Sequence, residues 1–328
     1  MAEYISTFTT GFSDIIPSAL RRLLPDVRVL KVYDGLVYYS YEGDAYTLTK
    51  VFFLNNTFVV IGSFLEKKPE IDEMVKSIIS LKELPKVKKS FRVRFSVNNQ
   101  FVSVNKRLVG QLEDKVCKLT NGRVDRVSPQ TEYWFIKRSE NVGFFARLIT
   151  KRRAIEKELN KGELRPEFAY LMCMLGELEH DSIVMDPFVG YGSIPKQIKK
   201  YFPYKTIYVS DKNEEQISKL KSDLKESPKI RISVGDALHM DNIASTSIDT
   251  IITDPPWGYY EDVEDIEEFY VDMISEFLRV IKKGGKIVVL SARKIEFERA
   301  IQTMNLSIKN KFDTLVNGKK AAVYVIDI

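Results

Sequence analysis

The stretch Thr314-Leu315-Val316-Asn317-Gly318-Lys319-Lys320-Ala321 places an Asn-Gly pair between two largely apolar segments. Such a pair is a strong signal for a type I′ hairpin, because both central residues of that turn need a positive φ. The sequence therefore predicts antiparallel strands at 307–316 and 319–328. An all-parallel dinucleotide-binding sheet does not contain such a hairpin.

Upstream of the hairpin, short β-branched segments alternate with amphipathic ones. We expect strands at 182–186, 206–211, 229–236, 248–254 and 286–292. Between them, 213–226 and 262–283 have helical spacing, and Gly284-Gly285 is expected to end the second helix. The alternation predicts a doubly wound α/β sheet of seven strands, parallel except at its hairpin.

The front half of the chain is less regular and predicts a mixed α+β region. We expect helices at 15–24, 71–81 and 108–119. We expect strands at 27–41, 46–61, 90–103, 131–137 and 143–149. Residues 150–165, rich in Lys, Arg and Glu, predict a linker.

Charge is distributed unevenly between the two halves. Residues 1–165 contain 29 Lys+Arg and 19 Asp+Glu, a net of +10, whereas residues 166–328 contain 21 and 26, a net of −5. A basic half favours a polyanionic partner, and a solubilising surface is the alternative. The basic residues expected to contact nucleic acid include Lys88, Lys89, Arg92, Arg94, Arg147, Arg152 and Arg153.

Composition excludes several classes of protein. No stretch approaches the roughly 18–20 consecutive apolar residues of a membrane span, and the first residues lack a signal-peptide pattern, so we expect a cytoplasmic protein with no membrane contact. Cys117 and Cys173 are far apart, which argues against a disulfide framework. His180 and His239 are too few and too distant for a zinc site, so no metal is expected.

A glycine turn is expected after the first strand of the rear half, in Asp186-Pro187-Phe188-Val189-Gly190-Tyr191-Gly192-Ser193. Its two glycines let the backbone turn tightly against a ligand. A dinucleotide-binding turn would carry a third glycine where this chain has Pro195. The turn thus indicates a cofactor without a pyrophosphate, and a tight turn with no ligand is the alternative.

Four expected strands end in an aspartate, namely Asp186, Asp211, Asp236 and Asp254. Ligands of open α/β sheets bind outside the carboxyl ends of the strands. The spacing of Asp211 from Asp186 would allow its carboxylate to accept hydrogen bonds from ribose hydroxyls. The carboxylate of Asp236 could accept one from an adenine amino group. Each acid alone is also explained by a helix cap or a turn, but together they predict an adenosine pocket.

The most informative motif is Thr253-Asp254-Pro255-Pro256-Trp257-Gly258. Two prolines fix the backbone and lack N–H donors, so the Asp254 side chain and the Pro255 carbonyl remain as acceptors beside an aromatic ring. Two such acceptors can hold the hydrogens of an exocyclic amino group and aim the nitrogen lone pair at a methyl donor. Trp257 would hold the base by stacking, worth about 1–3 kcal/mol. A purely structural turn would explain the prolines but not this combination.

These motifs resemble those of the THUMP-domain RNA methyltransferases of the TrmN type, which make N2-methylguanosine in tRNA. The resemblance covers about 150 to the end and rests on Leu164-Arg165-Pro166, Asp186–Ser193 and Thr253–Gly258. The front half resembles the family more loosely, through Phe144-Phe145-Ala146-Arg147 as the closing strand of a THUMP domain.

The resemblance implies a class I methyltransferase fold, Rossmann-like, behind an α+β front region. The implied domains are a ferredoxin-like region at 1–65, a THUMP-like RNA-binding domain at 66–149, a linker at 150–165 and the methyltransferase domain at 166–328. It also implies tRNA as partner and, as in some relatives, a small activator subunit.

The resemblance further assigns roles to named residues. Those expected to contact S-adenosyl-L-methionine are Asp186, Phe188, Gly190, Gly192, Asp211, Asp236 and Ala237. Those expected to hold the target base are Asp254, Pro255, Pro256 and Trp257. The alternatives are an rRNA guanine-N2 enzyme, a DNA amino-methyltransferase and a catalytically inactive RNA-binding protein.

Overall fold

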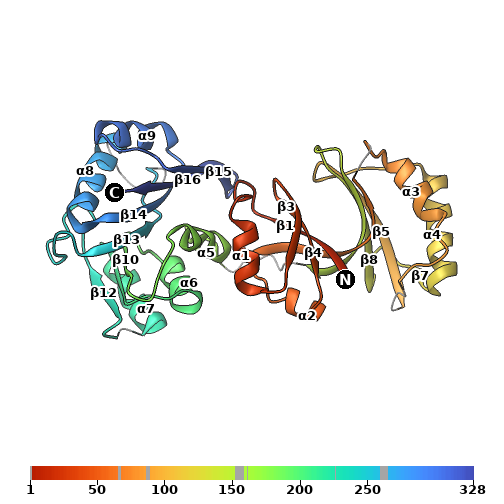
Figure 1. Ribbon diagram of the computed structural model, residues 1–328, viewed down its shortest axis with the longest axis horizontal. Helices are drawn as coiled ribbons and strands as arrows, with labels where there is room; N and C mark the ends of the chain where they lie inside the picture. Colours follow the sequence, from red (N-terminus) through yellow and green to blue (C-terminus); the bar gives the residue numbers. More distant parts are fainter. Residues whose placement is uncertain are drawn as a thin grey trace. The chain divides into compact units, whose positions relative to one another are not determined.

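The computed structural model describes residues 2–65, 68–85, 89–151, 159–160, 162–225, 227–258 and 265–328. The chain forms two compact units, each built on its own β-sheet (Figure 1). The first unit comprises Met1–Phe8 and Leu20–Arg153, and the second comprises Thr9–Ala19 and Ala154–Ile328. The chain therefore passes between the units at three places rather than one.

The second unit contains a sheet that ends in a hairpin. Its strands are β10 (Ile183–Asp186), β11 (Thr206–Asp211), β12 (Ile230–Val234), β13 (Ile248–Thr253), β14 (Ile281–Ser291), β15 (Asn310–Val316) and β16 (Lys319–Asp327). Within the described residues they form a seven-stranded sheet in the order β12-β11-β10-β13-β14-β16-β15. Strand β16 runs antiparallel to β14 and β15, and the other neighbours are parallel. This order is that of class I methyltransferases, so the predicted fold class is confirmed.

The hairpin forms for the reason that the sequence indicates. Asn317 and Gly318 have φ values of 50° and 80°, as both central positions of a type I′ turn require. Val316 pairs with Lys319 across the turn. The predicted Asn-Gly hairpin is thus confirmed.

Helices cover both faces of this sheet. They are α5 (Pro166–Leu175), α6 (Ser193–Tyr201), α7 (Glu214–Leu224), α8 (Ile266–Val280) and α9 (Lys294–Thr303). Figure 1 shows α8 and α9 on one side and α5, α6 and α7 on the other. The start of α8 is fixed by Asp265, whose carboxylate accepts from the N–H groups of Glu267 and Glu268. Its Tyr270 and Phe277 lie fully buried in the core of the unit.

The short N-terminal segment of the second unit packs on the rest of that unit. The Phe12 ring lies 5.8 Å from Phe168 and 6.0 Å from Phe312, between ring centroids. Gly11 has a φ of +90°, and a Cβ at this position would lie 2.0 Å from the carbonyl oxygen of Asp313. Only glycine permits this close approach of the two backbones.

The first unit is built on a larger sheet. Its strands are β1 (Ala2–Phe8), β2 (Arg28–Tyr33), β3 (Leu36–Tyr41), β4 (Leu54–Phe64), β5 (Ser90–Val97), β6 (Gln100–Phe101), β7 (Arg123–Val124), β8 (Thr131–Lys137) and β9 (Gly143–Lys151). Among the described residues the order is β2-β3-β1-β4-β9-β8-β5-β6, with β7 also paired to β5. Because β4 pairs with β9, one sheet runs through both of the predicted front regions. The predicted domain boundaries stay predictions.

Helices also contribute to the first unit. They are α2 (Ala45–Leu48), α3 (Ile71–Ile79) and α4 (Lys106–Thr120), while α1 (Ile16–Leu23) crosses the boundary between the units at residue 20. Helices α3 and α4 bury Val75 and Leu112 against Phe135 and Phe145 of the sheet. The alternate residues Phe144 and Ala146 belong to a second cluster, as expected of a strand that is covered on both faces.

Three strand predictions for the front half were wrong in detail. The segment 46–61 begins with the short helix α2, because Asp44 caps the N–H group of Tyr46 and strand β4 starts only at Leu54. The segment 27–41 forms two strands, since Gly35 turns the chain with a φ of 76°. The segment 90–103 is also interrupted, between β5 and β6.

Three predictions for the second unit also need correction. Gly284-Gly285 does not end a helix, because α8 ends at Val280 and both glycines lie inside β14. Strand β12 ends at Val234, so Asp236 lies two residues beyond the strand rather than at its end. Asp254 likewise follows β13 instead of ending it.

Candidate active site

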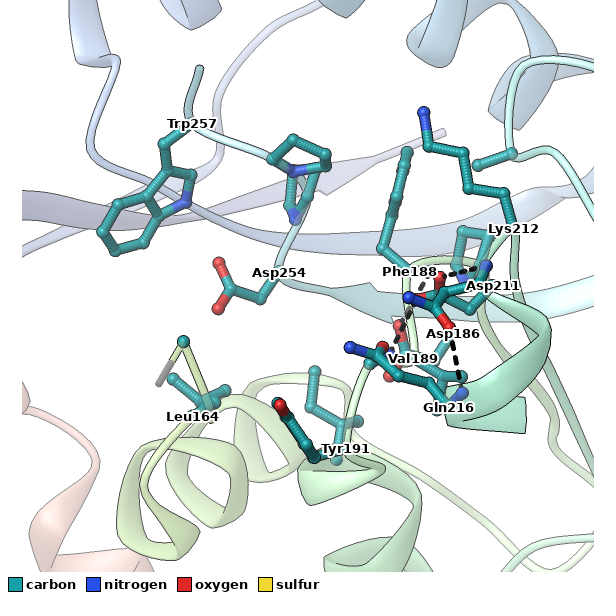
Figure 2. Close-up of a pocket in the computed structure, with 18 of the residues that line it drawn as sticks. Leu164, Asp186, Phe188, Val189, Tyr191, Asp211, Lys212, Gln216, Asp254 and Trp257 are labelled. Carbon is teal, nitrogen blue, oxygen red and sulfur yellow. Dashed lines mark hydrogen bonds between the residues drawn. The ribbon is translucent and has the colours of Figure 1, made fainter. Parts of the chain in front are cut away.

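A cavity of about 1250 Å³ opens at the carboxyl ends of the parallel strands of the second unit (Figure 2). Residues from the predicted cofactor set that line it are Asp186, Phe188, Gly190, Asp211, Asp236 and Ala237. The predicted base-binding residues Asp254, Pro255, Pro256 and Trp257 line the same cavity. Gly192 is not among the lining residues. The topology thus brings ten of the eleven predicted residues together.

The glycine turn between β10 and α6 is held by the next strand. The N–H group of Gly190 donates to Oδ2 of Asp211 at 2.9 Å, and the N–H group of Val189 donates to the carbonyl of Ser210 at 3.0 Å. Gly192 has a φ of +77°, and a Cβ there would lie 2.3 Å from Cδ1 of Leu220. A side chain at position 192 would therefore collide with Leu220, so the turn requires glycine here.

Asp186 is buried with one unsatisfied oxygen. Its Oδ1 accepts from the Thr253 hydroxyl at 2.8 Å and from the N–H group of Phe188 at 3.4 Å. Its Oδ2 is buried and has no hydrogen-bond partner among the described residues. An unsatisfied buried acceptor costs about 1–3 kcal/mol, so the site is suited to a ligand that supplies a positive group or a donor.

The pKa of Asp186 reflects this environment. Burial raises the pKa to about 7, against the hydrogen bonds from Thr253 and Phe188, and the charge of Asp211 adds to the rise. A cation bound beside this carboxylate would reverse the shift, because an opposite charge favours the ionised form.

The other two predicted adenosine contacts already accept backbone hydrogen bonds. Asp211 accepts at Oδ1 from the N–H group of Asn213 at 3.0 Å, in addition to the bond from Gly190. Asp236 is exposed and accepts from the N–H group of Leu238 at 2.9 Å. A carboxylate has about four lone-pair sites, so both aspartates keep acceptor capacity for a ligand.

The segment 254–257 leaves β13 and turns along the cavity. Figure 2 shows the carboxylate of Asp254 and the ring of Trp257 on the same side of this turn. The carbonyl of Pro256 accepts from the hydroxyl of Tyr270 at 3.2 Å. Acceptor groups and an aromatic ring thus line the same cavity as Asp186.

Several lining residues were not predicted from the sequence. They are Leu164, Lys212, Gln216, Asp265, Glu268, Phe269, Asp272, Val316, Asn317 and Lys319, among others. Phe269 lies 5.9 Å from Phe188, between ring centroids. The helical spacing of 262–283 marked Phe269 as apolar and the hairpin marked Asn317 as a turn residue, but neither pattern indicates a cavity. Thr253 belongs to the quoted motif, yet its bond to Asp186 depends on the pairing of β10 with β13.

The predicted basic residues of the first unit differ in their surroundings. Arg92 and Arg94 are partly buried and pair with Glu132 at 2.7 and 3.3 Å. Arg147 is partly buried, and Lys89 is exposed. The predicted residues Lys88, Arg152 and Arg153 lie outside the described residues.

Two aromatic rings flank Arg94 on this unit. Its guanidinium carbon lies 4.9 Å from the ring centroid of Phe101 and 5.5 Å from that of Trp134. The two rings are 5.5 Å apart and tilted by 44°. Phe101 is 64% exposed, which is unusual for a large apolar side chain on a sheet. We call Arg94, Phe101 and Trp134 the aromatic platform.

No helix in the described parts of the chain has the length and apolar character needed to cross a membrane. Over the same residues, no cluster of three or more His, Cys, Asp or Glu side chains is arranged to hold a metal ion.

The sheet order and the cavity at its edge define a class I methyltransferase. Residues 153–322, about half of the chain, match the family described as RMKL-like, methyltransferase domain (UPF0020). The chain belongs to this family, and the family predicted from the motifs is confirmed at the level of the methyltransferase domain.

Named relatives agree with this assignment. The chain is 30% identical over 131 residues to the bovine (Bos taurus) U6 snRNA (guanine-N(2))-methyltransferase THUMPD2, covering 39% of this chain and 25% of that protein. It is 20% identical over 384 aligned positions to the tRNA (guanine(6)-N2)-methyltransferase of Methanocaldococcus jannaschii, covering 99% and 100%. The chain thus spans a quarter of the bovine relative and the whole of the archaeal one.

A solved structure shares the fold over the full chain. The crystal structure of TrmN from Thermus thermophilus superposes with a TM-score of 0.78 at 19% identity, covering 100% of this chain and 99% of that chain. At this level of identity the likeness concerns the fold.

Proposed function

We propose that this protein transfers a methyl group from S-adenosyl-L-methionine to the exocyclic N2 of a guanosine in tRNA. The observation that carries the proposal is a single cavity that holds both Asp186, with its unsatisfied oxygen, and the segment 254–257. A cationic donor and a base amino group could meet in this space. The names of the bovine and archaeal relatives favour guanine N2 as the acceptor.

The residues of the cavity fit this cofactor. Asp186 offers a buried acceptor next to which a positively charged ligand is stabilised. Asp211 and Asp236 retain acceptor capacity for ribose hydroxyls and an adenine amino group, while Phe188 and Ala237 offer apolar contact. When bound, S-adenosyl-L-methionine supplies an electrophilic methyl group on a sulfonium.

The segment 254–257 would provide orientation and a proton acceptor. The lone pair of a guanine amino group is delocalised into the ring, so the nitrogen is a weak nucleophile. Asp254 and the Pro255 carbonyl would each accept one amino hydrogen, while Trp257 stacks on the base. The new N–CH3 bond forms as the S–CH3 bond breaks, the electron pair of that bond stays on sulfur, and the surplus amino proton leaves through Asp254 to water. Positioning of this kind can contribute roughly 7–11 kcal/mol in favourable cases.

The first unit would bind the RNA. Lys89, Lys106 and Arg107 are exposed and can contact phosphates, whereas Arg92 is already paired with Glu132. The aromatic platform offers a stacking surface for an unpaired base, and such stacking tolerates any base because every base has a π-face. Lys88, Arg147, Arg152 and Arg153 remain part of this proposed surface. We also propose that the protein is located in the cytoplasm.

The decisive experiment identifies the methylated nucleoside. The purified protein is incubated with methyl-labelled S-adenosyl-L-methionine and unmodified tRNA, rRNA or DNA, and the product is digested to nucleosides and separated. Labelled N2-methylguanosine from tRNA supports the proposal. Label found only in N2-methylguanosine from rRNA, or in a methylated DNA base, would show that the substrate is rRNA or DNA and not tRNA. Cofactor binding without transfer to any nucleic acid would favour an inactive RNA-binding protein.

A further inference from the structure

A buried tyrosine that does not line the cavity donates a hydrogen bond to the proposed base-binding turn. We propose that Tyr270, supported by Ser291, is a positioning residue that holds the segment 254–257 in the shape needed for methyl transfer. The inference rests on the proposed function and adds a residue to it that no motif indicated.

The hydrogen bonds form a chain with only one consistent direction. The N–H group of Arg293 donates to Oγ of Ser291 at 3.0 Å, Ser291 lies 3.0 Å from the hydroxyl of Tyr270, and Tyr270 lies 3.2 Å from the Pro256 carbonyl. A backbone N–H can only donate and a carbonyl can only accept. The Ser291 hydroxyl must therefore donate to Tyr270, and the Tyr270 hydroxyl to Pro256.

This chain connects separate elements of the second unit. Tyr270 lies on α8, Ser291 is the last residue of β14, and Pro256 lies in the segment after β13. Both hydroxyl-bearing residues have relative exposures of 0%. A buried hydroxyl is unfavourable unless it is hydrogen-bonded, so a phenylalanine at position 270 would suit the apolar surroundings better if the core alone mattered.

The turn needs such an external donor because of its prolines. Pro255 and Pro256 have no N–H group, so neither can anchor the segment by donating to a neighbouring strand. A donor to the Pro256 carbonyl fixes the peptide group between Pro256 and Trp257, and hence the direction in which the Trp257 side chain leaves the backbone. Burial, together with the charge of Asp254, raises the pKa of Tyr270, so its hydroxyl stays protonated as a donor.

The same helix turn also contacts the cofactor side of the cavity. Phe269, the neighbour of Tyr270, packs against Phe188 at 5.9 Å. Tyr270 itself packs edge-on against Phe297 at 5.2 Å. Since these ring contacts hold the tyrosine in place, loss of its hydroxyl alone should leave α8 where it is.

The test uses Tyr270→Phe, which removes the donor but keeps the ring. We expect kcat for tRNA methylation to fall about tenfold, because the partly buried Pro256 carbonyl loses its partner. The dissociation constant for S-adenosyl-L-methionine should stay within about twofold, because the bond is not on the cofactor side. The matched control is Tyr324→Phe, which removes another fully buried tyrosine hydroxyl of the same core, bonded to Glu298 instead. This control should leave kcat unchanged.

A second measurement does not depend on methyl transfer. Trp134 and Trp257 are the two tryptophans of the chain, so Trp134→Phe leaves Trp257 as the only indole reporter. In that background Tyr270→Phe should increase acrylamide quenching of Trp257, whose Nε1 is buried, and Tyr324→Phe should not. If no RNA is methylated by the wild type, the proposed function fails while this readout still tests the positioning.

A double-mutant cycle separates positioning from general loss of structure. If Tyr270 acts through the turn that places Trp257, the effects of Tyr270→Phe and Trp257→Ala on kcat should not add. Additive effects, or a Tyr270→Phe variant with unchanged kcat and unchanged quenching, would overturn the inference. A loss of kcat that Tyr324→Phe reproduces would also overturn it, because it would show a general effect of removing a buried hydroxyl.

Discussion

The two units satisfy their charged groups in different ways. In the second unit, Asp186 is buried with an oxygen that no described residue satisfies. In the first unit, the partly buried Arg92 and Arg94 are ion-paired with one carboxylate, Glu132, although Nε of Arg92 has no hydrogen-bond partner among the described residues. The difference indicates two kinds of recognition. The cavity suits a small cationic ligand, and we propose that the exposed surface of the first unit binds a large polyanion through many weak and salt-dependent contacts.

The largest effect should come from Asp254, the proposed acceptor for the amino group of the base. Asp254→Ala should reduce methyl transfer to tRNA on the order of 100- to 1000-fold, as for the loss of a group that orients the reacting atoms. Cofactor affinity, measured by calorimetry, should stay within about threefold. Asp223→Ala, which removes an exposed aspartate paired with Lys196, serves as the control. Equal loss of cofactor binding and turnover would show that Asp254 belongs to the cofactor side.

The next effect concerns the unsatisfied carboxylate. Asp186→Asn should weaken binding of S-adenosyl-L-methionine about 10- to 100-fold, because a buried charged acceptor becomes neutral. Binding of a cationic ligand favours ionised Asp186, so wild-type affinity should rise with pH up to about 7 and then level off. The asparagine variant should show no such rise. If the affinity of the wild type for S-adenosyl-L-methionine is constant between pH 5.5 and 8, Asp186 does not contact the charge of the ligand.

The pKa of Asp186 predicts the opposite pH dependence for the folding stability of the protein without ligand. The pKa of Asp186 is higher in the folded chain than its ordinary value of 3.8, so the folded state holds a proton that the unfolded state has already lost. The contribution of Asp186 to stability must therefore fall as pH rises from about 4 to about 7. Denaturant titrations of wild type and Asp186→Asn at several pH values measure it. The stability difference should shift in favour of the variant over this range, by up to about 4 kcal/mol. A constant difference would contradict the raised pKa.

Substitution in the aromatic platform tests whether the first unit binds tRNA through an open surface. Phe101→Ala should weaken tRNA binding about tenfold, because stacking on an aromatic ring contributes roughly 1–3 kcal/mol per base. Cofactor affinity should not change. Val127→Ala is a matched control, since Val127 is another exposed apolar residue of the same unit, at 88%. If both variants bind tRNA like the wild type in a filter-binding titration, the platform is not part of the RNA surface.

The smallest effect is expected for individual exposed cations. Lys106→Ala with Arg107→Ala should weaken tRNA binding by about three- to tenfold and should reduce the slope of log affinity against log salt by up to about 2. The proposed open surface requires this dependence. An affinity loss with an unchanged salt slope would point to a structural effect at the start of α4, where these residues lie.

Much of the second unit was predictable from the sequence because its signals are local. The Asn317-Gly318 turn, the glycine turn after β10 and the proline pair after β13 each act within a few residues. Parallel strands then bring their carboxyl ends to one edge of the sheet, so residues that follow different strands converge without further information. The errors arose where local signals compete, as at Gly284-Gly285, which also fits a glycine inside a bent strand.

The amino-acid sequence alone predicted the fold class of the methyltransferase half, its terminal hairpin and ten residues that line one cavity. Other features became visible only in the folded chain: the order of the strands, the pairing of β4 with β9, the ion pairs of Glu132 with two predicted RNA-binding arginines, and the hydrogen bond from Tyr270 to Pro256. The reason is physical. Turns and motifs are fixed by the backbone preferences of adjacent residues. Pairings between distant residues depend instead on the packing of the whole core, which the periodicity of the sequence does not reveal.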